Sequence, residues 1–424
     1  MKIAVIGGGS TYTPELIEGF ARRDAAMRVD ELVLQDIAAD RLAVVGGLAR
    51  RIMERQGWPG RLTTTSTLDA AIDGAAAVLV QLRVGGQRTR LVDETLPGQF
   101  GQLGQETTGP GGFAKGLRTV PVVLDIAERV RRRALPGAWI IDFTNPVGMV
   151  TRALLDEGHR AIGLCNVAIE FHRRVAAALG IPTGRIRLDH VGLNHLTWVR
   201  RVLHDGVDVL PALIAAGPAG VLPQLTEHPI ELIRTLGAVP SSYLNYYYRT
   251  DLAVQAQRGG EHRAVEVIEV ERQLLDMYAD PALDHKPALL EERGGAYYSE
   301  AAAALATSLL TGDGAHHYVN VRNNGTVAGL SDEAVVEVPA YVDQDGAHPV
   351  RVAPPAPDML ALMQAVTAYE VLTIEAATTG DRDTALRALL ANPLVRQWDV
   401  AVPLLDALLD ANSAHLPRFA GGRR

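Results

Sequence analysis

The sequence contains one cysteine, no excess of positive charge and no apolar run of membrane-spanning length. Because Cys165 is the only cysteine in 424 residues, an intrachain disulfide is excluded, which fits a reducing cytosol. The formal net charge of −8 disfavours nucleic acid and anionic membranes as partners. The apolar run 301–310 is well short of the ~20 residues that a membrane span needs, and the N-terminal run is too short for a signal peptide. We therefore expect a soluble, cytoplasmic protein without nucleic-acid or membrane partners.

The chain is too long for one compact core, so two domains are expected. Strand and helix patterns alternate up to about residue 180 and then stop alternating. Such alternation is typical of a parallel sheet with helices on both faces. The sequence therefore predicts an α/β fold, with a Rossmann-type, doubly wound parallel sheet over 1–180 and a mixed α+β domain over 181–424.

The N-terminal segment has the pattern of a nucleotide-binding turn. A buried strand over 2–7 leads into a run of glycines, and Thr13 and Pro14 are suited to start a helix. The next strand ends in an acid that would take the ribose hydroxyls, which favours NAD over NADP. Glycine amides and a helix N-terminus suit a pyrophosphate, although a G-x-G-x-x-G frame requires glycine where the chain has Tyr12. We assign cofactor binding to Gly7, Gly8, Gly9, Ser10 and Asp36 and, at the end of the fourth strand, to Arg83.

Polar residues cluster where the predicted strands end, at the edge where α/β sheets bind ligands. The glycine-rich segment 84–112 is expected to be a long loop, either functional or solvated with surface ion pairs. The following strands deliver Asn145, Cys165 and Asn166 to the same edge. Cys165 could hold a metal ion together with His195 of a later turn, whereas a lone cysteine is more often a small buried hydrophobe.

The second half of the chain shows a different pattern. Antiparallel strands are expected over 185–191 and 196–210, with Asp205 and Gly206 in a hairpin turn. Four tyrosines lie between residues 243 and 248, and we expect at least two of them in a core or an interface. Helices are expected around 223–238, 261–278 and, with apolar periodicity throughout, 356–415.

Several motifs taken together resemble one family. GGGSTYTPELIEGF, VDETLPGQFGQLGQETTGPGG, FTNPVGMVT, GLCNV, GLNH, YLNYYY and RGGAYYS resemble glycoside hydrolase family 4, in particular its 6-phospho-β-glucosidases. The resemblance runs from residue 2 to about residue 410, with the motifs in family order. A lactate or malate dehydrogenase would share the sheet, and we expect an α+β domain of their C-terminal type.

The resemblance implies a glycosidase that uses redox chemistry in place of the usual carboxylate pair. In this family NAD⁺ takes hydride from C3 of the sugar, and a tyrosine then removes the acidified C2 proton. A divalent metal, typically Mn²⁺, stabilises the enediolate while the C1 substituent is eliminated. Water then adds and the hydride returns, so NAD⁺ is regenerated.

The resemblance also implies roles for individual residues. Cys165 and His195 match the metal ligands, Tyr243 matches the base, and Glu106 matches the acid that raises its basicity. Asn166 stands at the catalytic position where α-specific relatives carry an aspartate proton donor, which favours β-linked substrates. The positions that match substrate contacts are Arg90, Asn145, Asn166 and Arg263. Two residues depart from the family pattern: Ala168 replaces a proline, and Asp142 replaces a common asparagine.

Several alternatives stay open. Thiolate and imidazole ligands favour Zn²⁺ or Fe²⁺ on softness, so the preference for Mn²⁺ rests on the resemblance. The enzyme could act on an unphosphorylated or acidic glycoside, or be an NAD-dependent dehydrogenase of the 2-hydroxy-acid type. A catalytically silent sugar or nucleotide sensor is a further alternative. The resemblance also implies a homodimer or homotetramer.

Overall fold

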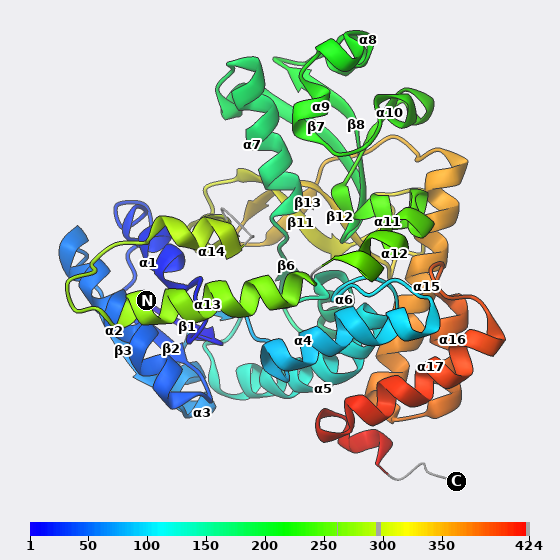
Figure 1. The fold of residues 1–424 in the computed structure, drawn as a ribbon. Helices are drawn as coiled ribbons and strands as arrows, with labels where there is room; N and C mark the ends of the chain where they lie inside the picture. The colour runs from blue at the N-terminus through cyan, green and yellow to red at the C-terminus, as the bar shows by residue number, and fades with distance from the viewer. Residues whose placement is uncertain (261, 294–297, 421–424) are drawn as a thin grey trace.

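A nine-stranded sheet forms the centre of the molecule (Figure 1). The computed structural model describes residues 1–260, 262–293 and 298–420. Six strands are parallel and adjacent in the order β6-β5-β4-β1-β2-β3, the Rossmann arrangement that the sequence predicts. Their bounds are β1 (Lys2–Ile6), β2 (Glu31–Gln35), β3 (Arg61–Thr65), β4 (Ala77–Val80), β5 (Trp139–Asp142) and β6 (Ala161–Gly163).

Alternate residues of these strands point into two separate hydrophobic clusters, one on each face of the sheet. Ile3 and Val5 pack with the helices α1 (Thr13–Ala21), α2 (Ala39–Gln56) and α14 (Tyr298–Thr311). Ala4 and Ile6 pack on the opposite face. The helices on that face are α3 (Leu68–Ile72), α5 (Gly109–Arg133), α6 (Val147–Asp156) and α15 (Pro357–Thr379). Burial on both faces explains why β1 and β4 are mainly apolar, whereas β3, with the sequence RLTTT, lies partly exposed at the end of the parallel strand order.

The expectation of a long loop over 84–112 is wrong. Most of this segment forms α4 (Gly86–Thr95) and the short 3₁₀ helix η1 (Leu96–Phe100), and α5 already begins at Gly109. Its glycines permit close backbone packing: a Cβ at Gly104 would lie 1.7 Å from the Glu94 carbonyl oxygen. A fully buried ion pair between Asp93 and Arg118 joins α4 to α5. Glycine therefore marks tight packing here, and the sequence pattern alone did not distinguish this from a flexible loop.

The second half contains a hairpin that projects from the sheet, at the top of Figure 1. Its strands β7 (Ile186–Leu193) and β8 (Leu196–His204) pair antiparallel, and Asp205 and Gly206 form the expected turn into β9 (Val207–Asp208). β10 (Val239–Pro240) pairs with β8. Four helices lie near the hairpin: α7 (Val167–Leu179), α8 (Leu210–Ala215), α9 (Leu222–Leu225) and α10 (Ile230–Leu236).

Three later strands complete the central sheet. β11 (Ala315–Arg322) pairs antiparallel with β6, and β12 (Val335–Asp343) and β13 (Gly346–Pro349) follow it to the edge. Residues from beyond position 180 thus contribute to the sheet, and the boundary at residue 180 stays a prediction. The helices α11 (Asn245–Tyr248), α12 (Thr250–Gly259) and α13 (Arg263–Ala279) connect the hairpin to α14.

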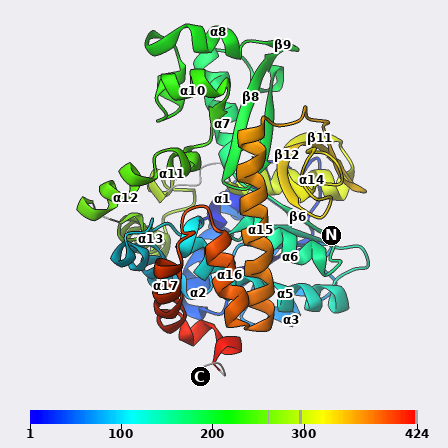
Figure 2. The same ribbon diagram turned by 90° about the vertical axis from the view of Figure 1, so that its right-hand side faces the viewer.

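The C-terminal segment is helical, as expected. α15 packs against α5, and α16 (Arg382–Ala391) and α17 (Trp398–Ala411) continue the layer (Figure 2). Among the described residues, α15 alone is long and apolar enough to cross a membrane by length and composition, and a core helix meets the same test. Met363, Val366 and Ala376 of α15 are buried in the larger hydrophobic cluster, so one side of this helix packs against the core.

Candidate active site

A cavity of ≈ 1420 Å³ lies at the carboxyl ends of the parallel strands. Its lining combines residues that follow β1, β2, β4, β5 and β6 with residues from the second half of the chain. Gly8 and Gly9 are not part of the lining and pack against β2 and the residue after it. The predicted site residues that line the cavity are Gly7, Ser10, Asp36, Arg83, Arg90, Glu106, Asn145, Cys165, Asn166, His195, Tyr243 and Arg263.

The turn after β1 has the geometry of a dinucleotide cradle. Gly7 has φ +85°, and a Cβ there would lie 2.6 Å from the Gln81 carbonyl oxygen, so only glycine fits. The N–H of Gly9 donates to Asp36 Oδ2 at 3.0 Å, which holds the carboxylate beside the turn. The N-terminus of α1 follows directly, where backbone N–H groups favour a phosphate. These residues fit NAD as the bound group.

The thiol of Cys165 lies between the end of β6 and the start of α7 and is 3% exposed. The backbone N–H groups of Asn166 and Val167 and the side chain of Asn194 form hydrogen bonds with the sulfur. Burial raises the pKa of this thiol, whereas these hydrogen bonds favour the thiolate. The net shift of this pKa is upward, so the sulfur stays a protonated thiol at pH 7, and a cation that binds there would displace the proton.

His195 occupies the turn between β7 and β8 with φ +60°, a backbone conformation in which histidine is enriched. Its Nδ1 lies 2.9 Å from the Thr107 hydroxyl oxygen. Burial lowers the pKa of His195 to about 4, so the imidazole is neutral at pH 7 and able to bind a metal. Within the described part of the chain no group of three or more potential metal ligands occurs. Cys165 and His195 would therefore leave coordination positions open, as Lewis-acid catalysis requires.

Tyr243 lies flat against His195. Their ring centroids are 3.7 Å apart and the planes differ by 4°. Burial raises the pKa of the Tyr243 phenol, and negative charge at Cys165 and Glu106 raises it further. Of the neighbouring tyrosines, Tyr246 also lines the cavity, while Tyr247 and Tyr248 pack against the core, as expected for two of the four.

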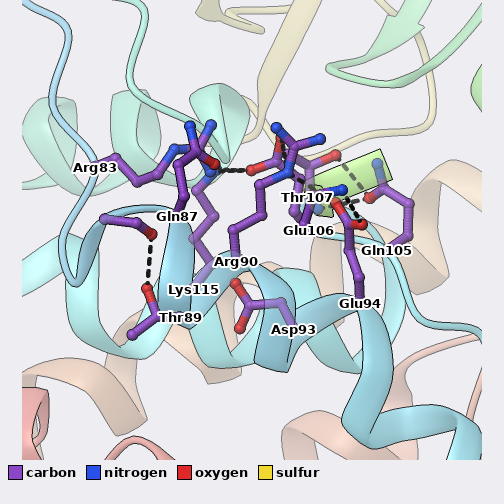
Figure 3. A network of polar contacts seen from close by, with 12 residues as sticks. Arg83, Gln87, Thr89, Arg90, Asp93, Glu94, Gln105, Glu106, Thr107 and Lys115 are labelled. Atoms are coloured by element: carbon purple, nitrogen blue, oxygen red, sulfur yellow. Dashed lines mark hydrogen bonds and ion pairs between the residues drawn. The ribbon is translucent and has the colours of Figure 1, made fainter. Parts of the chain in front are cut away.

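Glu106 lies at the centre of a cationic cluster (Figure 3). It forms ion pairs with Arg83, with Lys115 at 2.7 Å and with Arg90 at 3.4 Å. Burial opposes ionisation of Glu106, but these cations hold its pKa well below the usual value. Arg90 also pairs with Glu94 at 2.7 Å. Arg83 therefore shares the carboxylate of Glu106 with Arg90, the predicted substrate arginine. Its predicted contact with the cofactor stays a prediction.

Two more of the predicted residues that line the cavity are Arg263 and Asn145. Arg263 begins α13, is half-exposed, and contacts Glu266 and the carbonyl oxygen of Glu292. The buried Oδ1 of Asn145 has no partner among the described residues, so it is available to a ligand. Residues 294–297 of the RGGAYYS motif lie outside the described residues. The motif's Tyr298 donates from its hydroxyl to the carbonyl oxygen of Leu164 at 2.8 Å and so supports the strand end beside Cys165.

The sequence did not single out several residues that organise the site. Lys115 lies in α5, and the sequence indicated no role for its side chain. Glu337 of β12 is buried, and its carboxylate accepts hydrogen bonds from His190 at 3.0 Å, Asn194 at 3.0 Å and Asn320 at 3.2 Å. A buried acid in an apolar strand was the available signal, because such a group requires partners. Glu337 thus holds the same Asn194 that contacts the Cys165 thiol.

Comparisons with known proteins show which family the chain resembles. The model of family 4 glycosyl hydrolases matches residues 2–181, and the model of the family 4 C-terminal domain matches residues 190–395. A probable 6-phospho-β-glucosidase of Bacillus subtilis is 40% identical, over 99% of this chain and 98% of that protein. A 6-phospho-β-glucosidase of Thermotoga maritima, solved with manganese, NAD⁺ and glucose-6-phosphate, has a TM-score of 0.91 at 34% identity, covering 98% of this chain and 99% of that one.

The fold is also shared more widely. A malate dehydrogenase of Salinibacter ruber has a TM-score of 0.53 at 17% identity, covering 90% of this chain and 99% of that one. A likeness at this identity shows the fold alone. It agrees with the expectation of a Rossmann-type sheet followed by a domain of the dehydrogenase C-terminal type. The two family models together span nearly all of residues 2–395, and the similarity to the Bacillus subtilis protein extends over almost the full chain. This protein belongs to family 4 of the glycosyl hydrolases.

Proposed function

We propose that the protein hydrolyses 6-phospho-β-glucosides to glucose 6-phosphate and an aglycone, with NAD⁺ and a divalent cation, Mn²⁺, as cofactors. The observation that carries the proposal is the shared cavity. Cys165, His195 and Tyr243 line the same space as Gly7 and Asp36 of the nucleotide turn. The relatives whose names state 6-phospho-β-glucosidase activity match almost the whole chain.

The chain's own residues would position the substrate and move one proton. When bound, NAD⁺ supplies a hydride acceptor and the cation supplies a Lewis acid for the sugar oxygens. Tyr243 would remove the C2 proton, because its ring lies against the ligand His195. A phenol is a poor base at neutral pH unless a cation lowers its pKa. Because burial raises the pKa of Tyr243 above its usual value, the phenol would need that cation in order to act as a base.

Charge around Glu106 would fit a phosphorylated sugar. Three cations, Arg83, Arg90 and Lys115, surround Glu106 at the cavity wall. A guanidinium can bind a dianionic phosphate through two charge-assisted hydrogen bonds. We assign Arg90 to the substrate, with Arg263 at the rim as a second contact and Asn145 on the sugar hydroxyls. Asn166 at the start of α7 offers no acid to a departing group, which fits a β-linked substrate.

The compartment and assembly are part of the same proposal. A phosphorylated sugar does not cross membranes freely, so we place the enzyme in the cytoplasm, where Cys165 stays reduced. We propose a homodimer or homotetramer for its state in solution, and sedimentation of the purified protein tests this directly.

A comparison of two substrates tests the proposed activity. The enzyme is supplied with p-nitrophenyl β-glucoside or its 6-phosphate, with and without NAD⁺ and Mn²⁺, in a reductant that keeps Cys165 as a thiol. We expect release of p-nitrophenol from the phosphorylated compound only with both cofactors present. Preference for the unphosphorylated compound would assign a different family 4 substrate. Accumulation of NADH in step with turnover would instead identify a dehydrogenase.

A further inference from the structure

Three residues form a hydrogen-bond chain behind the metal-facing imidazole. The Oε1 atom of Gln105 lies 2.9 Å from the Thr107 hydroxyl oxygen, which in turn lies 2.9 Å from Nδ1 of His195. Gln105 and Thr107 belong to the connection between η1 and α5, and His195 belongs to the β7–β8 turn. These hydrogen bonds therefore link the two halves of the site. Figure 3 shows Gln105, Thr107 and Glu106 side by side on this connection.

The direction of each hydrogen bond follows from the donors available. The backbone N–H groups of Thr107 and Thr108 both point at Gln105 Oε1, at 2.5 and 2.7 Å. Two N–H donors require an acceptor, so this atom is the amide oxygen and not the amide nitrogen. An acceptor can receive the Thr107 hydroxyl proton but cannot supply one. The Thr107 hydroxyl therefore donates to Gln105, and only its lone pairs face His195.

The tautomer of His195 follows from this direction. Because the Thr107 oxygen has no proton left for Nδ1, the short contact between them requires Nδ1 to carry the hydrogen. In a neutral imidazole the other nitrogen, Nε2, then holds the lone pair. No described residue forms a hydrogen bond with Nε2, and His195 lines the cavity. We infer that Thr107 and Gln105 are positioning residues that fix His195 as the Nδ1–H tautomer and present Nε2 to the metal.

The inference rests on the proposed function only in taking His195 as a metal ligand. Its test therefore uses two measurements that need no substrate. Long-range ¹H–¹⁵N correlation spectra of histidine-labelled apoprotein report the tautomer, with His195→Gln used to assign the signal. Electron paramagnetic resonance of free Mn²⁺ gives the metal affinity. Activity is a poor readout by itself, because Thr107 also contacts the Tyr243 phenol.

Matched variants distinguish the effect of the hydrogen bonds between Gln105, Thr107 and His195 from the effect of side-chain packing. Thr107→Val keeps the shape but removes the hydroxyl, and Thr107→Ser restores it. Gln105→Glu keeps an acceptor for all three donors. The control is Thr119→Val, since Thr119 is a buried threonine of α5 whose hydroxyl has no partner among the described residues. Thermal unfolding of each variant confirms that it is folded.

We expect the Nδ1–H tautomer in the wild type, in Thr107→Ser, in Gln105→Glu and in Thr119→Val. Thr107→Val should give a mixture of tautomers and weaken Mn²⁺ binding by roughly 10- to 100-fold. An Nε2–H tautomer in the wild type would overturn the inference. Unchanged Mn²⁺ affinity and tautomer in a folded Thr107→Val would overturn it as well. Failure of the 6-phosphoglucoside assay, by contrast, would leave both measurements standing.

Discussion

At the scale of single residues, the contact between Tyr243 and His195 would link proton transfer to metal binding in the proposed reaction. A phenol stacked at 3.7 Å on an imidazole lies beside any cation that the imidazole binds. A cation bound there would lower the pKa of the Tyr243 phenol, which burial raises. The negative charge of Glu106 acts in the opposite direction, and Lys115 and Arg83 moderate it. The pKa of the Tyr243 phenol therefore depends on several side chains that lie far apart in the sequence.

Loss of the Tyr243 hydroxyl tests the assignment of the base. Tyr243→Phe should lower kcat by about 10²- to 10⁴-fold, the usual contribution of a general base, because the ring packing stays while the acceptor is lost. Steady-state hydrolysis of the phosphorylated p-nitrophenyl substrate measures the effect. Tyr341→Phe, at a half-exposed tyrosine of β12, is the control and should retain wild-type activity. Wild-type activity in Tyr243→Phe would remove the base from the account.

Glu337 predicts a stability effect. Its two oxygens accept from three buried donors, so Glu337→Gln turns one acceptor into a donor that faces another donor. We expect a loss of about 1–3 kcal/mol in the free energy of unfolding, measured by denaturant titration. Glu375→Gln on the exposed face of α15 should change stability by less than about 0.5 kcal/mol. Equal stability of the two variants would contradict the role of Glu337 as an acceptor of three buried hydrogen bonds.

The same residues show what the sequence could indicate about the site. Cys165, His195 and Tyr243 were predictable because strand ends and family motifs place them, and the structure brings all three to one cavity. Their catalytic roles stay predictions. Lys115, Thr107 and Glu337 were not predicted, because each acts through a partner more than eight positions away and no local spacing encodes that contact.

At the scale of elements, the turn after β1 is joined to the end of β2 by the hydrogen bond from the Gly9 N–H to the Asp36 carboxylate. A Cβ at Gly9 would lie 2.8 Å from Asp36 Oδ2, so Gly9→Ala forces this carboxylate to move. We expect NAD⁺ affinity to fall by about 10- to 100-fold, equivalent to one charged hydrogen bond. Fluorescence titration measures it. Gly184→Ala, where a Cβ meets open space, should bind NAD⁺ normally, and normal binding by Gly9→Ala would contradict the cradle.

The strand β11 makes stability depend on pH. Burial lowers the pKa values of His316 and His317 to about 4. Between pH 6.5 and 4 the unfolded rings bind protons and the folded rings do not, so stability falls as the pH falls through this window. His317→Gln should reduce the slope by up to ~1.4 kcal/mol per pH unit, measured by denaturation at pH 6.5, 5.5 and 4.5. An unchanged slope would contradict this assignment.

At the scale of the whole molecule, the six parallel strands were predictable and the sheet's extension was not. Mainly apolar strands that alternate with helices indicate a Rossmann-type parallel sheet from local sequence patterns. β11, β12 and β13 return to β6 from more than 150 residues later, and no local pattern specifies which strand edge they join. This return places Glu337 behind the β7–β8 turn, so the long-range pairing completes the site.

The central claim is that one cavity unites the nucleotide turn, the two metal ligands and a carbon-proton base. Hydrolysis of the 6-phosphoglucoside in D₂O, followed by mass spectrometry and NMR of the sugar, tests it most directly. The account predicts deuterium at C2 of the released glucose 6-phosphate, because Tyr243 exchanges the removed proton with solvent. A glycosidase with a carboxylate pair leaves this C–H bond intact. Hydrolysis at the full rate with only hydrogen at C2 would contradict the account.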